Sequence, residues 1–168
     1  MSDPERAARN LLRKFPGIRL PIRLHRICDF LGVEIRYAAA PKHIFDAYYT
    51  EGLFPPAKRL IIVNDEFPLA HQRFSAAHEL GHFVLGHGAA GFLNVPSDTV
   101  REEWQEIEAN RFAAELLMPE TLLRKHHVAR AEQIRYLCDV SLSAARIRME
   151  VLRQRKSSPL VAAVHRRA

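Results

Sequence analysis

The sequence predicts an α+β fold in which a few short strands precede a mostly helical remainder. Between residues 33 and 63, apolar residues alternate with charged ones or form short β-branched runs, whereas from about residue 69 onward they recur at helical spacing. The chain has 168 residues, 48% hydrophobic and 26% charged, as in an ordinary soluble domain with a packed core. No linker-like stretch precedes residue 156. We therefore expect one domain over residues 1–155 and a basic tail over residues 156–168.

Two helices are expected at the N-terminal end. Ser2 can cap the first, with Pro4 in its opening turn, and the breakers Phe15-Pro16-Gly17 end it. The second begins at Pro21 and ends at Gly32, because glycine suits the left-handed residue that follows a helix.

Three strands and five helices are expected to follow. The strands cover residues 33–37, then Ala47 to Phe54, then Leu60 to Val63 before the turn Asn64-Asp65. The helices cover residues near 69–86, 98–118 and 119–127, and a C-terminal hairpin over about 130–155 that turns near Asp139-Val140-Ser141.

The strongest functional signal is His78-Glu79-Leu80-Gly81-His82, the pattern His-Glu-x-x-His inside a helical stretch. Residues four apart lie on one helix face, so His78 and His82 can reach one metal ion, with Glu79 turned toward the adjoining space. Zinc held this way activates a water, and Glu79 can take that water's proton as general base. The alternative is a pair of half-buried histidines on an amphipathic helix with Glu79 in solvent. The apolar residues around the histidines favour the zinc site, and Gly81 permits close approach of another backbone.

The third zinc ligand must come from elsewhere in the chain. His87 lies five residues after His82, whereas metzincins place a third histidine six residues on, after a glycine bend. Here those two positions are Gly88 and Leu85, so the metzincin pattern fails.

A second helix offers a carboxylate instead. Glu106 and Asn110 are four residues apart on one face, which would let Glu106 bind zinc while Asn110 orients a ligand histidine. Glu108 lies about 200° around the helix from Glu106 and cannot serve from the same face.

These blocks together resemble the ImmA/IrrE family of metallo-endopeptidases. The likeness rests on residues 73–82, on 106–119 and on Asp139-Val140-Ser141, and it runs over about residues 20–152. It implies a zincin-type domain, mostly helical, with a small N-terminal sheet packed on the helix that carries the motif. Matched onto this chain, it implies zinc on His78, His82 and Glu106 with Glu79 as the catalytic base. Glu108 is the second candidate for the third ligand.

The resemblance also implies a substrate class, because family members often cleave a helix-turn-helix repressor in mobile-element control or in DNA-damage response. We therefore expect a cytoplasmic zinc endopeptidase that acts on such a regulator. Two alternatives are a toxin held by its antitoxin and a non-catalytic module that binds a repressor or nucleic acid. Retention of both histidines, Glu79 and Glu106 argues against the module but does not separate the protease from the toxin. The oligomeric state is left open.

Charge is concentrated at the C-terminal end. The net charge is +6, and residues 124–168 carry 11 Lys and Arg against 3 Asp and Glu. This end could bind nucleic acid or an acidic partner, but arginines that solvate helix faces explain it more simply.

Residues 131–151 could form a DNA-binding helix-turn-helix with Ser141 as the N-cap of its second helix. The simpler interpretation is a helical hairpin that packs on the catalytic core through its apolar residues, which are Ile134, Leu137, Val140, Leu142, Ile147 and Leu152.

For several other residues the sequence gives weaker evidence of a function. Tyr48 and Tyr49 face opposite sides of a strand, so at most one could stabilise an oxyanion, and structural roles are favoured. His126 and His127 are expected to meet carbonyls at a helix end.

Cys28 and Cys138 are far apart and in no ligand or redox spacing, which predicts two buried thiols in a reducing compartment. The sequence contains no apolar run long enough for a bilayer, and no membrane association is expected.

Overall fold

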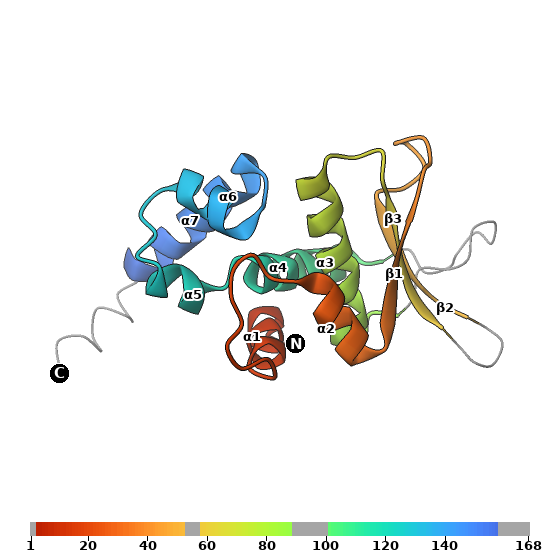
Figure 1. Ribbon diagram of the computed structural model, residues 1–168, viewed down its shortest axis with the longest axis horizontal. Helices are drawn as coiled ribbons and strands as arrows, with labels where there is room; N and C mark the ends of the chain where they lie inside the picture. The colour runs from red at the N-terminus through yellow and green to blue at the C-terminus, as the bar shows by residue number, and fades with distance from the viewer. Residues whose placement is uncertain (1–2, 53–57, 89–100, 158–168) are drawn as a thin grey trace.

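The computed structural model describes residues 3–52, 58–88 and 101–157 and confirms the α+β prediction (Figure 1). The described part of the chain forms a three-stranded sheet and seven helices. In chain order the elements are α1 (Pro4–Leu12), α2 (Leu24–Leu31), β1 (Val33–Ala38), β2 (Ala47–Glu51), β3 (Arg59–Asn64), α3 (Leu69–Leu85), α4 (Glu103–Leu117), α5 (Glu120–Lys125), α6 (Ala131–Cys138) and α7 (Leu142–Ser157).

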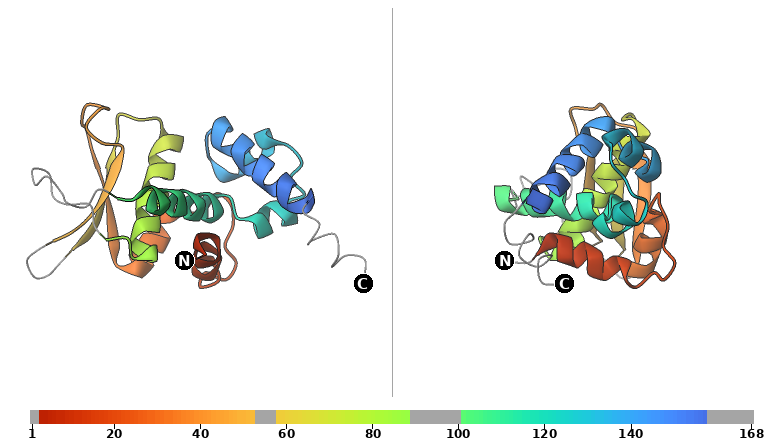
Figure 2. Two further views of the ribbon diagram at one scale, coloured as in Figure 1. Left: turned by 180° about the vertical axis from the view of Figure 1, so that it is seen from behind. Right: turned by 90° about the vertical axis from the view of Figure 1, so that its left-hand side faces the viewer.

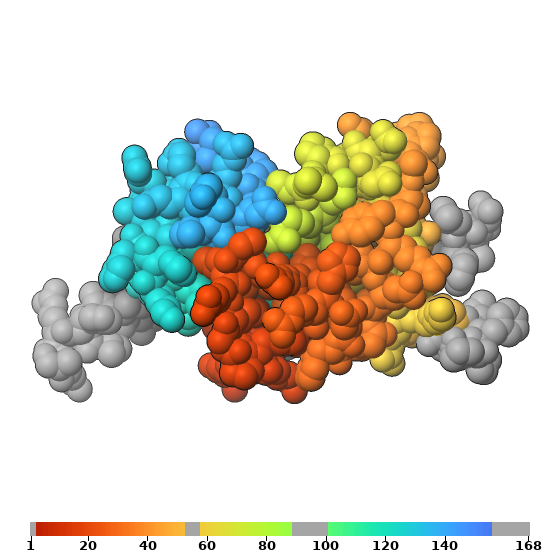
Figure 3. Space-filling view, in the orientation of Figure 1, coloured from red at the N-terminus to blue at the C-terminus, as the bar shows by residue number. Residues whose placement is uncertain are grey.

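The sheet lies at one end of the molecule and α5, α6 and α7 lie at the other (Figures 1 and 2). Helices α3 and α4 cross between these two ends, and α1 packs against α4. The space-filling view shows a hollow between α3 and the C-terminal helices, above the N-terminal segment (Figure 3). The sheet packs on α3 through β2 and β3, as expected from the resemblance.

The sheet has the order β1-β3-β2 and is mixed. Strand β1 runs parallel to β3, and β2 runs antiparallel to it, so β2 is an edge strand. Tyr49, Ile61 and Val63 are buried and turn the sheet's apolar face toward the helices. Since β2 also packs against α3, an N–H group on its unpaired edge can meet a side chain of that helix.

Helix α3 is fixed at both ends by local interactions. The side chain of Gln72 donates hydrogen bonds to the carbonyls of Asp65 and Phe67 and so shapes the turn before the first helical residues. Gly86 ends the helix with φ of 75°, the left-handed conformation that glycine adopts without steric cost.

Helices α3 and α4 approach closely at Gly81, as the sequence suggested. A Cβ atom at Gly81 would lie 3.1 Å from Phe112 Cδ1 and 3.2 Å from the carbonyl oxygen of Ala109. The absent side chain therefore lets the backbone of α4 lie against α3, and this contact sets how far the acidic residues of α4 are from the histidines of α3.

Two details of the expected elements are corrected. Asp3, not Ser2, caps α1, because the Asp3 side chain accepts a hydrogen bond from the N–H of Arg6. The second helix begins at Leu24 rather than at Pro21. Ser2 itself lies outside the described residues.

Other expected boundaries fall partly outside the described residues. Strand β2 is described to Glu51, and Phe54, the expected end of that strand, is outside. The same holds for residues 98–100, expected to open α4, and for residues 158–168 of the expected tail.

The C-terminal hairpin is present, and Ser141 caps α7 by accepting a hydrogen bond from the N–H of Ala144. The expectation that Ile147 packs inward is wrong, since 67% of it is exposed, whereas Ile134 and Val140 are buried. In the last turn of α4, Glu115 forms a fully buried ion pair with Arg148 of α7. This charged contact adds to the apolar packing of Ala145 and Met149, which belong to the same buried cluster as the apolar residues of α4.

Both cysteines are buried and unpaired, as expected. Burial raises the pKa of Cys28 to about 12 and that of Cys138 to about 12, so neither thiol ionises at neutral pH. Among the described helices, none is both long and apolar enough to span a bilayer.

Candidate metal centre

Helix α3 presents His78, Glu79 and His82 toward α4. His82 is fully buried, Glu79 is 4% exposed, and the side chain of His78 is 15% exposed. The two imidazoles stand one turn apart, with their Nε2 atoms 2.9 Å from each other. One potential donor atom from each of the three residues lies within 4.8 Å of the others.

Glu106 of α4 completes the cluster. Its Oε2 lies 3.0 Å from His78 Nε2, and its Oε1 lies 3.3 Å from His82 Nε2. The carboxylate thus faces both imidazoles on the side where their Nε2 lone pairs converge. The structure brings together the three residues that the sequence proposed as ligands.

These donor atoms fit a zinc ion. Ligand atoms about 2.0–2.1 Å from a tetrahedral zinc lie about 3.3 Å from one another, close to the separations seen among His78, His82 and Glu106. Zinc also requires a neutral imidazole. Burial lowers the pKa of His82 to about 2, and the charge of Arg101 adds to this, so His82 is neutral at physiological pH.

Glu79 is engaged by other groups and is the weaker candidate for a ligand. Its Oε2 accepts a hydrogen bond of 3.0 Å from the backbone N–H of Tyr49 on β2. Arg101, just before α4, donates from Nη1 to Oε1 at 3.2 Å and from Nη2 to Oε2 at 2.9 Å. A carboxylate held by donors on both oxygens is oriented for proton transfer rather than for metal binding.

Sequence reasoning missed Arg101 altogether. The residue belongs to no motif, and it reaches Glu79 across 22 positions of sequence. Its side chain is only 15% exposed, and its Nε is buried with no hydrogen-bond partner in the part of the chain that the structure describes. No pattern of residue types at fixed spacing would have revealed this contact.

Two further polar residues hold the histidines. Asn110 Oδ1 lies 3.0 Å from His78 Nδ1, the place expected of a residue that orients a ligand. Glu108 faces away from Glu106, as its helical position predicted, and its Oε2 lies 3.3 Å from Nε2 of His87. His87 in turn contacts Nδ1 of His82 at 3.0 Å, so it lies behind the cluster and not in it.

A cavity of about 280 Å³ opens beside His78 and Glu79. Its wall includes Phe74 and the hydrogen-bonded side chains of His71 and Asp46, whose Nε2 and Oδ2 are 2.9 Å apart. The space is large enough for a side chain of a bound peptide next to the polar cluster.

The two tyrosines considered as oxyanion-stabilising residues do not place their hydroxyl groups in the cluster. Tyr49 contributes its backbone N–H, while its ring packs 5.3 Å from that of Phe83 and its hydroxyl donates to Glu51. Tyr48 stacks edge-on against Phe45. The structural roles favoured for both rings agree with these contacts.

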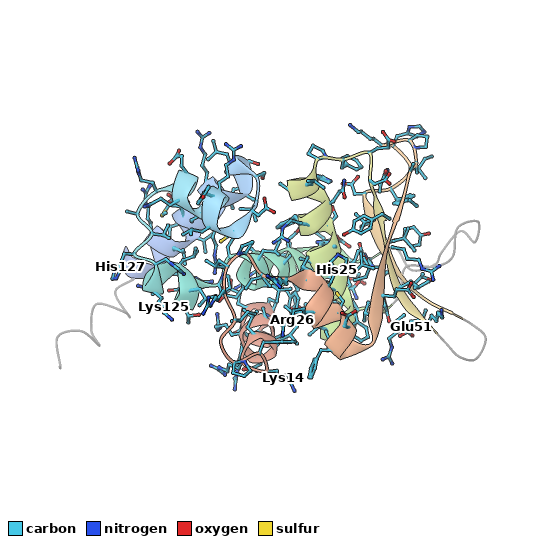
Figure 4. All side chains as sticks on the ribbon, viewed as in Figure 1. Lys14, His25, Arg26, Glu51, Lys125 and His127 are labelled. Carbon is cyan, nitrogen blue, oxygen red and sulfur yellow. The ribbon has the colours of Figure 1, made fainter. Side chains whose placement is uncertain are left out.

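His126 and His127 follow α5 at the other end of the molecule (Figure 4). Their backbone N–H groups donate to the carbonyls of Leu122 and Arg124, which closes the helix end.

Comparison with known proteins agrees with the resemblance seen in the sequence. The family model of the IrrE N-terminal-like domain, a peptidase family, matches residues 28–150. No curated protein matches the sequence significantly. A solved structure, a transcriptional regulator from Mycobacterium tuberculosis, superposes with a TM-score of 0.57 at 14% identity.

The superposition covers 86% of this chain but only 46% of the regulator, so the chain spans less than half of that protein. At this identity the likeness concerns the fold alone. The family match extends over most of the chain and includes every residue of the cluster around His78. The chain therefore belongs to the IrrE N-terminal-like peptidase family.

Proposed function

We propose that this protein is a zinc-dependent endopeptidase with His78, His82 and Glu106 as zinc ligands and Glu79 as general base. The convergence of the Glu106 carboxylate on the two Nε2 atoms is the observation that carries the proposal. It supplies two imidazoles and one carboxylate, the ligand set that leaves a fourth zinc position for water. Membership in a peptidase family supports the same chemistry.

When bound, zinc lowers the pKa of a coordinated water to roughly 7 and polarises the carbonyl of the scissile bond. Glu79 accepts the proton of the attacking water and passes it to the leaving amine. A carboxylate offers about four acceptor positions, and hydrogen bonds from Tyr49 and Arg101 occupy three of them. One position is left for the water, so the orientation of Glu79 is restricted.

The substrate we propose is a helix-turn-helix repressor, cleaved in the cytoplasm. The family assignment supports this substrate class, and the solved neighbour is itself named a transcriptional regulator. The cavity beside His78 and Glu79 gives room for one substrate side chain. In this proposal the basic helices at the C-terminal end solvate the protein and do not bind DNA.

Zinc stoichiometry and affinity test the ligand assignment. We expect about one zinc per chain by elemental analysis, and loss of that zinc in His78→Ala and His82→Ala. In a competition titration, Glu106→Ala should weaken zinc binding more than Glu108→Ala, because only Glu106 faces both imidazoles. Equal affinity of the parent and both histidine variants would show that the metal centre is elsewhere. A larger loss in Glu108→Ala would transfer the ligand role to Glu108.

A further inference from the structure

We propose that His87 and Glu108 are positioning residues that fix the tautomer and ring orientation of His82 through a buried hydrogen-bond chain. The inference rests on the proposed zinc site and adds two residues that act through a ligand without touching the metal. It gives Glu108, the second candidate for the third zinc ligand, a role that does not require contact with the metal.

The hydrogen-bond chain from His82 through His87 to Glu108 is continuous and shielded from water. His82 Nδ1 lies 3.0 Å from His87 Nδ1, and His87 Nε2 lies 3.3 Å from Glu108 Oε2. The three side chains are 0%, 3% and 7% exposed, respectively. Because little solvent reaches these contacts, the facing ring nitrogens of His82 and His87 depend on one another for a hydrogen bond.

Local structure places His87 behind His82. Gly86 turns the backbone at the end of α3, and the N–H of His87 then donates to the carbonyl of His82 at 2.9 Å. The ring of Trp104 packs edge-on against the His87 ring, with centroids 5.4 Å apart. A turn residue and an aromatic contact therefore hold the His87 ring between α3 and α4.

The proton positions along the chain follow from the direction of the His82 lone pair. His82 Nε2 faces His78 and Glu106, so metal binding there requires the proton of neutral His82 on Nδ1. This N–H must donate to Nδ1 of His87, which places the proton of a neutral His87 on Nε2. That second N–H donates to a carboxylate oxygen of Glu108.

The other assignments break the hydrogen-bond chain. A proton on Nδ1 of both histidines would set two N–H groups against each other, and a proton on neither would set two lone pairs together. If His87 donated from Nδ1 to His82, the lone pair of its Nε2 would face the carboxylate oxygen of Glu108. Glu108 thus selects the tautomer of His87, and His87 selects that of His82. The Nδ1 of His78 is contacted directly by Oδ1 of Asn110, without an intervening histidine.

The experiment measures zinc affinity in the full chain by competition titration. His87→Ala and Glu108→Ala should each weaken zinc binding about 10- to 100-fold. His87→Gln should recover part of the loss in His87→Ala, because an amide both accepts and donates. His25→Ala is the matched control, since it removes an imidazole from an exposed pair with Tyr37 and should leave zinc affinity unchanged. Unchanged affinity in His87→Ala, or a loss that glutamine does not reduce, would overturn the proposal.

A spectroscopic readout covers the case in which a variant does not fold. Long-range proton–nitrogen NMR of the zinc-loaded parent should show His82 protonated on Nδ1 and His87 protonated on Nε2. A proton on Nδ1 of His87 would overturn the proposal directly.

Failure of the zinc site itself is a separate result. If the parent binds no zinc, the proposed function is wrong. If the parent binds zinc and His82→Ala does not, yet His87→Ala matches the parent, only the positioning chain is wrong.

Discussion

Glu79 and Arg101 form an ion pair whose side chains are 5% and 15% exposed. From the sequence alone, we expect the packing around position 79 to survive a change to glutamine, because glutamine is close in shape to glutamate. The structure changes that expectation, since the substitution removes the nearer of two carboxylates that face the buried guanidinium; the other is Glu106, whose Oε1 lies 4.0 Å from Arg101 Nη1. Variants of Glu79 therefore report on stability as well as on catalysis.

A double-mutant cycle measures this coupling. Glu79→Gln and Arg101→Gln should each lower the free energy of unfolding, while the double variant should lose less than the sum by about 1–3 kcal/mol. Urea denaturation of the four metal-free proteins gives the coupling energy. The exposed Glu34–Arg36 pair is the control and should show a smaller coupling. Additive losses at Glu79 and Arg101 would show that the two charges do not interact in solution.

His82 makes the metal-free protein sensitive to acid. Its pKa is about 2 in the folded chain but about 6.5 when unfolded, so the unfolded state binds the additional proton between these values. The contribution of neutral His82 to the free energy of unfolding is therefore fully present above pH 6.5. Below that pH the free energy of unfolding falls by on the order of 1 kcal/mol per pH unit. Urea denaturation between pH 7 and pH 5.5 should show this decline, and the free energy of unfolding of His82→Gln should fall less over the same range. Identical slopes for the parent and this variant would mean that His82 is not the sensitive group.

At the scale of the elements, the site depends on how closely α4 lies against α3. Gly81→Ala adds a methyl group 3.1–3.3 Å from atoms of Phe112 and Ala109, and two of the three contacts are to backbone. Overpacking costs about 1–3 kcal/mol, while alanine gains up to about 1 kcal/mol in helix propensity over glycine. We expect a net loss of stability.

Movement of α4 should also weaken zinc binding, because Glu106 moves with it. Thermal unfolding and zinc titration of Gly81→Ala measure the two effects. Leu69→Ala, at an exposed position of the same helix, should change neither. A Gly81→Ala protein with parental stability and zinc affinity would show that α4 can shift without moving the ligand.

The elements that carry the ligands could be predicted because their signals are periodic. Helical spacing located α3 and α4, and the positions of Glu106 and Glu108 around α4 predicted which of the two faces the histidines. The contacts to Glu79 could not be predicted in this way. Tyr49 donates from its backbone, so its residue type carries no information. Arg101 is one of 25 Lys and Arg residues and is placed only by the tertiary fold.

At the scale of the whole molecule, a single arginine links segments far apart in the sequence. Arg73 on α3 donates to the carbonyls of Ile22, Cys138 and Asp139. It thereby joins the N-terminal segment and the turn of the C-terminal hairpin to the helix that carries the motif. This link supports the proposal that residues 1–155 form one domain.

The hairpin is held through apolar packing and through charge. Ile134, Val140 and Met149 belong to the same buried apolar cluster as Leu116 of α4, as the apolar spacing predicted, whereas Ile147 is exposed. The buried pair of Glu115 with Arg148 adds a charged connection to α4. Residues of the N-terminal helix take part too, since Arg9 Nη1 lies 3.8 Å from Glu115. Such a network is hard to predict because a charge pattern alone does not show which pairs become buried.

Cleavage of a protein substrate by the zinc-loaded parent and by Glu79→Gln tests the central claim most directly. The substrate to test is a helix-turn-helix repressor of the class proposed above, and mass spectrometry detects its fragments. Loss of the general base should slow cleavage by about 10²- to 10⁴-fold, equivalent to roughly 3–5 kcal/mol, while zinc content stays near one per chain. Removal of zinc with a chelator should also abolish cleavage by the parent protein. Cleavage by zinc-loaded Glu79→Gln at the parental rate would contradict the proposed mechanism.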